Sequence, residues 1–248
     1  MSDFAGRDGV ALVTGGTGGI GSAIVRMLVE RGSTVAFTYL HDAQGAAVLE
    51  AASGGAAGYQ LDLSDPVGVR AVLSEIGPVH TLVYASGPHV PMVHLSTVSP
   101  ERFREQLEVD AAGFFSLVQQ ALPLLRKTGG SLVAVTTAAN RRFPVRDGLS
   151  AAPKAAIEAL VRGLAVEEGR FGVRANSVGP GMLTDGMAAR LIDSGELDDE
   201  ALQITRGNIP LRRFGTALDI AEAVCFLASE RAAFITGQAL DVDGGYGA

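Results

Sequence analysis

The sequence of 248 residues predicts a single α/β domain built on a doubly wound parallel sheet. Apolar segments of strand length alternate with amphipathic segments along the chain, and the strand segments do not alternate apolar with polar residues. Strands of a parallel sheet have this continuous apolar character because helices bury both of their faces. No long polar linker and no internal repeat divides the chain, so we expect one domain over residues 1–248.

The expected elements follow one another from strand to helix. The sequence predicts strands at residues 10–14, 34–39, 57–61, 81–85, 131–136, 174–178 and 239–242. It predicts helices at residues 19–31, 43–52, 66–76, 101–126, 149–171 and 217–227. We expect the helix at 101–126 to be interrupted near Asp110, and Pro66 suits a first helical turn. Right-handed crossovers between parallel strands then favour the doubly wound arrangement.

The composition argues against several classes of protein. Acidic residues outnumber basic residues, and the net charge of −7 gives no basic surface for nucleic acid. No run of about 18 apolar residues could span a membrane, and we find no signal peptide, so we expect a cytosolic protein. Cys225 is the only cysteine and lies in an apolar stretch, which predicts a buried thiol in a helix and no intrachain disulfide.

A glycine-rich turn follows the first predicted strand and runs directly into the first predicted helix. The turn reads Thr14-Gly15-Gly16-Thr17-Gly18-Gly19-Ile20-Gly21. Glycine allows a positive φ and a close approach of the backbone to a pyrophosphate, and the helix N-terminus adds free N–H groups. The turn therefore predicts a dinucleotide site that includes Gly15, Thr17, Gly19, Ile20 and Gly21.

The segment TGGTGGIG resembles the TGxxxGIG signature of the short-chain dehydrogenase/reductases, and the resemblance covers nearly the whole chain. It implies a Rossmann fold that binds a nicotinamide dinucleotide. It also implies that Asp62, beside Leu63, contacts the adenine amine, although an Asp in this place also suits an ordinary turn or helix N-cap. Further cofactor contacts are implied after the fourth strand and in the segment around the nicotinamide carboxamide: Ala85, Gly87, Pro180, Gly181, Met182 and Thr184.

The end of the second predicted strand favours NADP over NAD. An Asp or Glu there would bind both ribose hydroxyls and repel a 2′-phosphate, whereas this sequence has Tyr39-Leu40-His41. Asp42 follows as an alternative acidic contact, and no Arg is present to bind the phosphate. We therefore expect Tyr39 and His41 beside the ribose, with His41 assisting when protonated, NADP as the cofactor and NAD as the alternative.

The catalytic positions match the family pattern only in part. The resemblance implies a Tyr that exchanges the proton, a Lys four residues later that holds the nicotinamide ribose, a Ser that holds the substrate oxygen, and an Asn. Lys154 matches the Lys, Thr137 stands at the Ser position, and Asp110 stands at the Asn position. Ser150 stands where the Tyr is expected, and an aliphatic hydroxyl is a much weaker acid than a phenol. The spacing of the enoyl-reductase branch, seven residues before the Lys, falls on Asp147.

Other side chains are alternative proton donors. His89 and His94 follow the fourth strand, and Tyr84 ends it, but each also suits a surface or packing position. Asp110 could be protonated if it is buried, or could support Lys154. The loop before the long helix carries three arginines that either meet an anionic substrate or lie in solvent: Arg141, Arg142 and Arg146.

These features predict an atypical NADP(H)-dependent reductase for the carbonyl or enone of a small organic substrate. Water or a substrate hydroxyl would supply the proton, which a phenolic or polyketide-like substrate would suit. The alternative is a catalytically silent dinucleotide-binding protein that acts as a sensor or a subunit partner. The resemblance also implies a homotetramer, or failing that a homodimer, whose long helices pair through small residues: Ala155, Ala156, Ala159 and Gly163.

Overall fold

A parallel sheet forms the centre of the molecule. The computed structural model describes residues 2–88, 90–185 and 199–248. Within these residues, seven strands form one sheet in the order β3-β2-β1-β4-β5-β6-β7, and all neighbouring strands are parallel. The strands are β1 Val10–Thr14, β2 Val35–Tyr39, β3 Ala56–Gln60, β4 Val79–Tyr84, β5 Ser131–Val135, β6 Arg174–Pro180 and β7 Ala239–Val242. The predicted doubly wound α/β fold is therefore confirmed.

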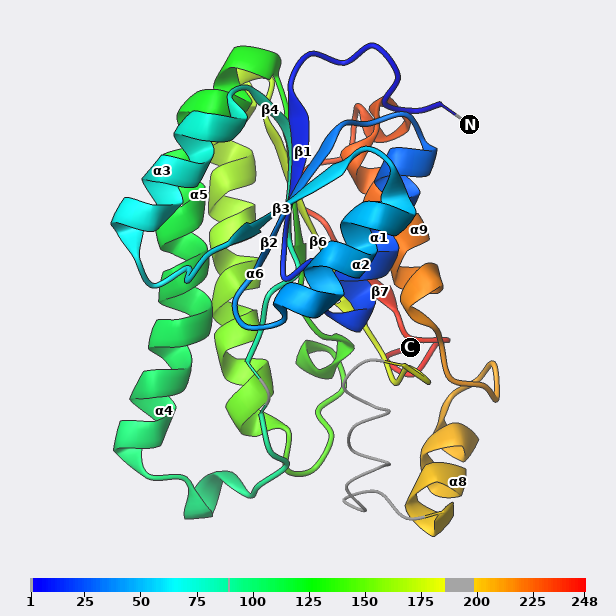
Figure 1. Cartoon of the computed structure of the whole chain (residues 1–248). Coiled ribbons are helices and arrows are strands. Elements are labelled where there is room, and N and C mark those ends of the chain that lie inside the picture. The colour runs from blue at the N-terminus through cyan, green and yellow to red at the C-terminus, as the bar shows by residue number, and fades with distance from the viewer. Residues whose placement is uncertain (1, 89, 186–198) are drawn as a thin grey trace.

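Helices cover both faces of the sheet, with α1 and α9 on one face and α3, α5 and α6 on the other (Figure 1). Their bounds are α1 Gly19–Glu30, α2 Ala43–Ser53, α3 Pro66–Ile76, α4 Pro100–Leu107, α5 Gly113–Thr128, α6 Gly148–Glu168, α8 Asp199–Asn208 and α9 Ala217–Ala228. The sequence did not predict α8, whose residues DEALQITRGN carry few apolar side chains. The predicted interruption near Asp110 is confirmed, because a π-helical turn at Glu108–Ala112 separates α4 from α5.

Successive residues of the central strands belong to different halves of the core. Val13 and Val83 pack in the half that contains α1 and α9, whereas Leu12 and Leu82 pack in the half that contains α3, α5 and α6. Cys225 on α9 is buried in the first half, and this burial raises the pKa of its thiol to about 12. The predicted buried thiol is confirmed. None of the described helices combines the length and apolar character that crossing a bilayer requires.

The carboxyl ends of β1 and β4 form the point at which the chain connections diverge to opposite sides of the sheet. Such a point leaves a crevice where ligands bind in open α/β sheets. The Thr14 hydroxyl at the end of β1 accepts hydrogen bonds from the N–H groups of Ala85 and Ser86, each at 3.2 Å. One threonine side chain therefore fixes the spacing of the two strand ends that border the crevice.

Asn176 joins β6 to the segment before β7 through a buried side chain. Its amide nitrogen donates to the Ile235 carbonyl at 2.9 Å, and its oxygen accepts from the Gln238 N–H at 3.0 Å. Buried backbone groups that lose a hydrogen-bond partner cost about 1–3 kcal/mol each. This amide therefore holds the last strand of the sheet in register with β6.

We expect Asn176→Ala to lower the free energy of unfolding by about 1–3 kcal/mol, because it removes both hydrogen bonds of a fully buried amide. Denaturant unfolding followed by circular dichroism measures this change. Gln44→Ala on the exposed surface of α2 is the control and should change stability by no more than about 0.5 kcal/mol. Equal stabilities of the two variants would contradict the assignment.

Candidate active site

The glycine-rich turn between β1 and α1 has the geometry that a dinucleotide pyrophosphate requires. Gly15 has φ +67°, and a Cβ atom on Gly21 would lie 2.1 Å from the Gly15 carbonyl oxygen, so the turn closes tightly only with glycine there. The first N–H groups of α1 have no partner within the helix, and α1 has no acidic residue in its first turn. Gly19, Ile20 and Gly21 therefore present their N–H groups at a site that suits a phosphate.

The residues expected near the adenosine lie at the ends of β2 and β3. One oxygen of the exposed Asp42 carboxylate caps α2 by accepting the Gly45 N–H at 2.8 Å. One oxygen of Asp62 accepts from both the N–H and the hydroxyl of Ser64, and these bonds lower the pKa of the Asp62 carboxyl. Asp62 thus forms a turn, which was the alternative role expected for it, and no described residue binds its second oxygen.

The segment expected around the nicotinamide is held between β7 and the loop before α9. The Gly181 N–H donates to the Val242 carbonyl at 3.0 Å, and the Thr184 N–H donates to the Gly215 carbonyl at 2.9 Å. The Met182 carbonyl accepts from the Gly215 N–H at 3.0 Å. Residues 180–184 therefore cross the carboxyl edge of the sheet beside the crevice.

Lys154 and Asp110 form an ion pair at this edge. The ammonium nitrogen of Lys154 lies 3.0 Å from a carboxylate oxygen of Asp110, and their side chains are 13% and 2% exposed. Lys154 also donates to the Ser86 carbonyl at the end of β4, at 3.4 Å. The π-helical turn presents Asp110 to the lysine, and such turns often occur at functional sites. The structure thus brings together two of the four predicted catalytic residues.

Tyr84 supports this pair from inside the core and is not positioned to donate a proton to a substrate. Its hydroxyl donates to the backbone carbonyl of Asp110 at 3.1 Å and lies 3.3 Å from the carboxylate. Its ring lies 5.5 Å from the Lys154 nitrogen, and its side chain is 1% exposed. Burial, and then the Asp110 charge, raise the pKa of the phenol well above its ordinary value of 10. Tyr84 is therefore a packing residue, as one of the two sequence alternatives proposed.

Thr137 and Ser150 lie on separate elements at the carboxyl edge. Thr137 follows β5, and its hydroxyl accepts the Ala139 N–H at 3.2 Å. Ser150 lies in the first turn of α6, one turn before Lys154, and its hydroxyl has no hydrogen bond within the described part of the chain. His94 is exposed at the N-terminus of a short 3-10 turn, Leu95–Thr97, and His89 lies outside the described residues.

The loop arginines have partners that the sequence did not indicate. Arg141 pairs with Asp241 at 3.0 Å, and Arg142 donates to the Tyr246 carbonyl at 3.0 Å while its guanidinium lies 4.5 Å from the Tyr246 ring centre. These two arginines contact the C-terminal segment while their side chains remain exposed, as the solvated alternative expected. Arg146 has φ +72°, which is uncommon outside glycine.

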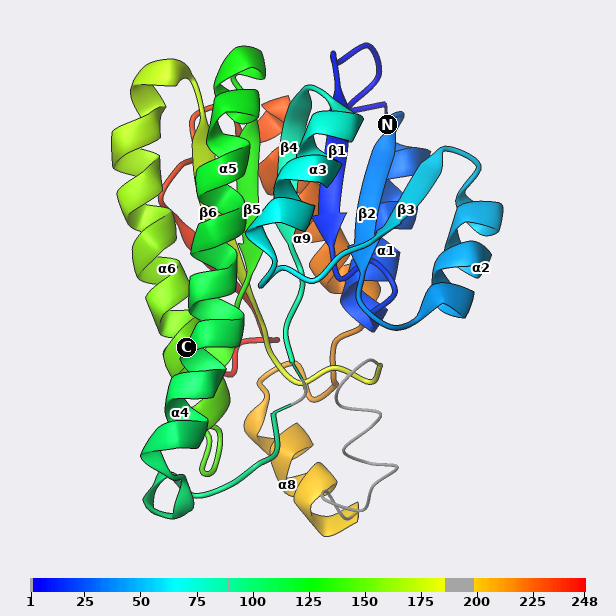
Figure 2. The same ribbon diagram turned by 60° about the vertical axis from the view of Figure 1, so that its left-hand side comes forward.

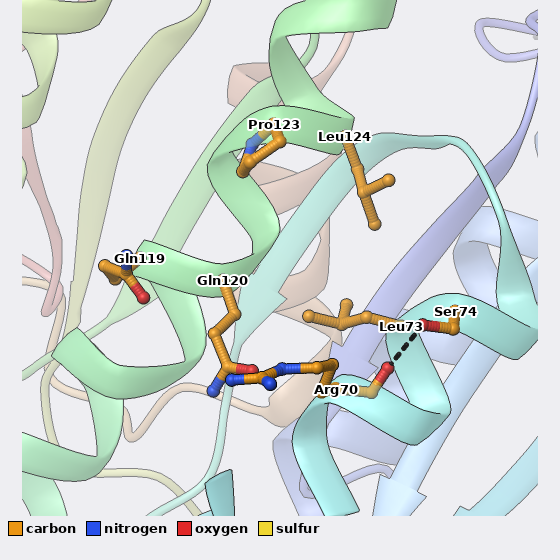
Figure 3. Close-up of a pocket in the computed structure, with 7 residues that line it drawn as sticks. All are labelled: Arg70, Leu73, Ser74, Gln119, Gln120, Pro123 and Leu124. Atoms are coloured by element: carbon orange, nitrogen blue, oxygen red, sulfur yellow. Dashed lines mark hydrogen bonds between the residues drawn. The ribbon is translucent and has the colours of Figure 1, made fainter. Parts of the chain in front are cut away.

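Two grooves are present on the described surface. A groove of about 330 Å³ lies between α3 and α5, where side chains from the two helices project toward each other (Figure 3). Its residues lie in the halves of α3 and α5 that lead to the amino ends of β4 and β5, so it is not part of the crevice. A second groove, of about 290 Å³, lies at the carboxyl edge between residues 94–95 on one side and residues 143–146 and 148 on the other.

Sequence reasoning missed two residues that organise the site. Thr14 links β1 to β4 through its hydroxyl, and the Ser86 carbonyl accepts from Lys154. Thr14 stands inside the quoted glycine-rich signature, and a buried hydroxyl before a turn is a signal for a hydrogen bond across strands. The Ser86 contact uses a backbone atom, for which the sequence carries no signal.

Comparison with known proteins agrees with this geometry. A family model described as enoyl-(acyl carrier protein) reductase matches residues 15–247. The L-fucose dehydrogenase of Mus musculus is 35% identical over 99% of this chain and 90% of its own length. The 2,5-dichloro-2,5-cyclohexadiene-1,4-diol dehydrogenase of Sphingobium indicum is 33% identical over 99% of both chains.

Solved structures give the same result. A short-chain dehydrogenase/reductase family protein superposes with a TM-score of 0.87 at 35% identity, covering 99% of this chain and 100% of the other. A blue fluorescent protein from a metagenomic library, in complex with NADPH, superposes with a TM-score of 0.88 at 30% identity over 99% and 100% of the two chains. The chain therefore belongs to the short-chain dehydrogenase/reductase family of oxidoreductases.

Proposed function

We propose that this protein is an NADP(H)-dependent reductase that acts on the carbonyl or enone of a small organic substrate without the family's catalytic tyrosine. The observation that carries the proposal is the position of Lys154, which Asp110 and the Ser86 carbonyl hold at the crevice beside the glycine-rich turn. A loose surface lysine would not have two such partners. The NADPH complex of a structural relative supports the choice of cofactor, as does the lack of an acidic residue at the end of β2.

Different residues of this chain bind the cofactor and orient the substrate. When bound, the nicotinamide supplies the hydride. The N-terminus of α1 holds the pyrophosphate, Lys154 holds the nicotinamide ribose, and residues 180–184 hold the carboxamide. The hydroxyl groups of Ser150 and Thr137 orient the substrate oxygen, so that the reacting atoms stay close.

The names of the relatives describe oxidation of a hydroxyl group, the reverse of the proposed reduction. Hydride transfer to a carbonyl is reversible, so a substrate panel should contain ketones, enones and quinones together with cyclic alcohols.

The catalytically silent alternative is favoured by Ser150 at the tyrosine position and by the carboxylate that neutralises Lys154. Cofactor binding without turnover of any member of the panel would establish that alternative instead.

We expect the protein to bind NADPH more tightly than NADH. Strand β2 ends at Tyr39 without an acidic residue, and the first carboxylate after it, Asp42, lies three residues later and caps α2. Calorimetric titration with both cofactors measures the two dissociation constants. Equal affinities, or tighter binding of NADH, would contradict the assignment to NADP.

We expect Ser150→Ala to lower turnover by no more than about tenfold, because one neutral hydrogen bond contributes about 0.5–1.5 kcal/mol. Lys154→Ala should lower turnover by about a hundredfold through a misplaced ribose. Steady-state rates and thermal unfolding of both variants give the comparison. The double variant Lys154→Ala/Asp110→Asn removes the unpaired buried carboxylate, and so separates loss of folding from loss of catalysis. An inactive Ser150→Ala beside a normal Lys154→Ala would reverse the proposed roles.

We also expect a homotetramer, or failing that a homodimer. α5 and α6 stand side by side at one edge of the molecule (Figure 2), and Ala155, Ala159 and Gly163 form an exposed row of small residues along α6. Open space surrounds Gly163, which leaves room for a second helix. Light scattering should give a multiple of the 25.5 kDa chain mass, and Ala159→Arg should reduce it. A mass of one chain at all working concentrations would exclude the assembly.

A further inference from the structure

The N-terminal turn of α6 carries a carboxyl group that the proposed mechanism has not used. Asp147 is the N-cap residue of α6, and its carbonyl accepts from the N–H groups of Ser150 and Ala151 at 3.1 and 2.9 Å. These bonds bring Asp147 into the register of the helix. Helical residues at positions i, i+3 and i+7 share one face, so Asp147 and Ser150 lie in one row with Lys154.

The row runs from Lys154 to the N-terminal end of α6. At 1.5 Å per residue, Asp147 lies about 4.5 Å along the helix axis from Ser150 and about 10.5 Å from Lys154. Because the ion pair fixes Lys154 at the crevice, Asp147 lies on the same face about two turns farther out.

The Asp147 carboxyl group has no partner in the described part of the chain. Asp is a preferred N-cap residue because its carboxylate accepts helix N–H groups, yet Asp147 makes no such bond. No described residue forms a hydrogen bond or an ion pair with this carboxyl, although its side chain is partly buried. Burial, acting alone, raises the pKa of Asp147 to about 6. A protonated fraction therefore persists near neutral pH.

The segment 93–95 packs against the two chain neighbours of Asp147. The Val93 N–H donates to the Arg146 carbonyl at 3.1 Å, and a Cβ atom on Gly148 would lie 2.6 Å from the Leu95 side chain. Both chain neighbours of Asp147, Arg146 and Gly148, line the groove of about 290 Å³ at the carboxyl edge.

Among the described residues, two ionisable side chains line this groove. His94 and Arg146 line the same groove, and Lys154, two turns away, is neutralised by Asp110. The Asp147 carboxyl group therefore belongs to a residue beside this groove, on the helix face that also carries Lys154.

We propose that Asp147 is the catalytic acid of the reductase, in place of the family's tyrosine; the inference rests on the proposed function. As the hydride adds to the carbonyl carbon, the π pair of the C=O bond moves onto the oxygen. The O–H bond of Asp147 breaks, and its proton passes to that oxygen directly or through one water molecule. The carboxylate then takes a proton from solvent. In alcohol oxidation, the carboxylate accepts the proton instead.

The pH dependence of ketone reduction tests this assignment. The rate of the unmodified protein should fall about tenfold per pH unit above pH 6, because the acid must be protonated. Asp147→Asn should lower the rate by about 10²–10⁴-fold and abolish this dependence, whereas Asp147→Glu should retain it. Glu167→Gln, which removes an exposed carboxylate near the other end of α6, is the control and should keep the parental profile.

A second measurement does not depend on activity. A carboxyl whose folded pKa is raised favours the folded state below its unfolded pKa of about 4, and this contribution is lost as the pH rises through about 6. The unfolding equilibrium of the unmodified protein should therefore change, relative to Asp147→Asn, by about fiftyfold between pH 4 and pH 7. Thermal and denaturant unfolding of the two proteins across this range measure the difference.

The outcomes separate the two proposals. Turnover by the unmodified protein, with an unchanged rate and pH profile in Asp147→Asn, would overturn the role of Asp147 and leave the reductase function in place; His94 would then be the next donor to test. A constant stability difference from pH 4 to pH 7 would also overturn it. Cofactor binding without any turnover would overturn both proposals.

Discussion

The ion pair between Lys154 and Asp110 is the interaction on which the candidate site depends. It joins α6 to the π-helical turn between α4 and α5, and the Ser86 carbonyl adds the end of β4. Taking two charges out of water is expensive, so the pair itself contributes little net stability, whereas loss of one partner costs about 3–5 kcal/mol. The pair therefore acts chiefly to set position: the lysine has one place in which its charge is compensated.

The π-helical turn makes this placement possible. A π turn adds one residue to the helical path, which rotates the following residues by about 100° relative to an uninterrupted α-helix. α5 can therefore pack its apolar side on the sheet while Asp110 faces Lys154. The Tyr84 hydroxyl binds the Asp110 carbonyl at this turn, where the regular pattern of helix hydrogen bonds changes. The buried phenol of Tyr84 thus supports the site through its hydrogen bond to a backbone carbonyl.

The sequence predicted the architecture well because the strands are apolar on both faces and the turns carry glycine. Bounds for β1, β7 and α3 agree with the prediction, and the others differ by few residues, since helix and strand ends fray. α8 was missed because its polar sequence has no apolar stripe. At the site, the sequence indicated Lys154 and Asp110 separately, and left open whether Asp110 was protonated or supported the lysine. It could not predict that Arg141 and Arg142 bind the C-terminal segment, because partners about 100 residues apart leave no local pattern.

Those two arginines connect the loop before α6 to the C-terminal segment. Asp241 and Tyr246, near the C-terminus, hold Arg141 and Arg142 in the loop that leads to Asp147. The last residues of the chain therefore support the loop that precedes α6. A tag or fusion attached at Ala248 would disturb these contacts, and so would affect catalysis from outside the site. For this protein, the choice of terminus for a tag therefore bears on function.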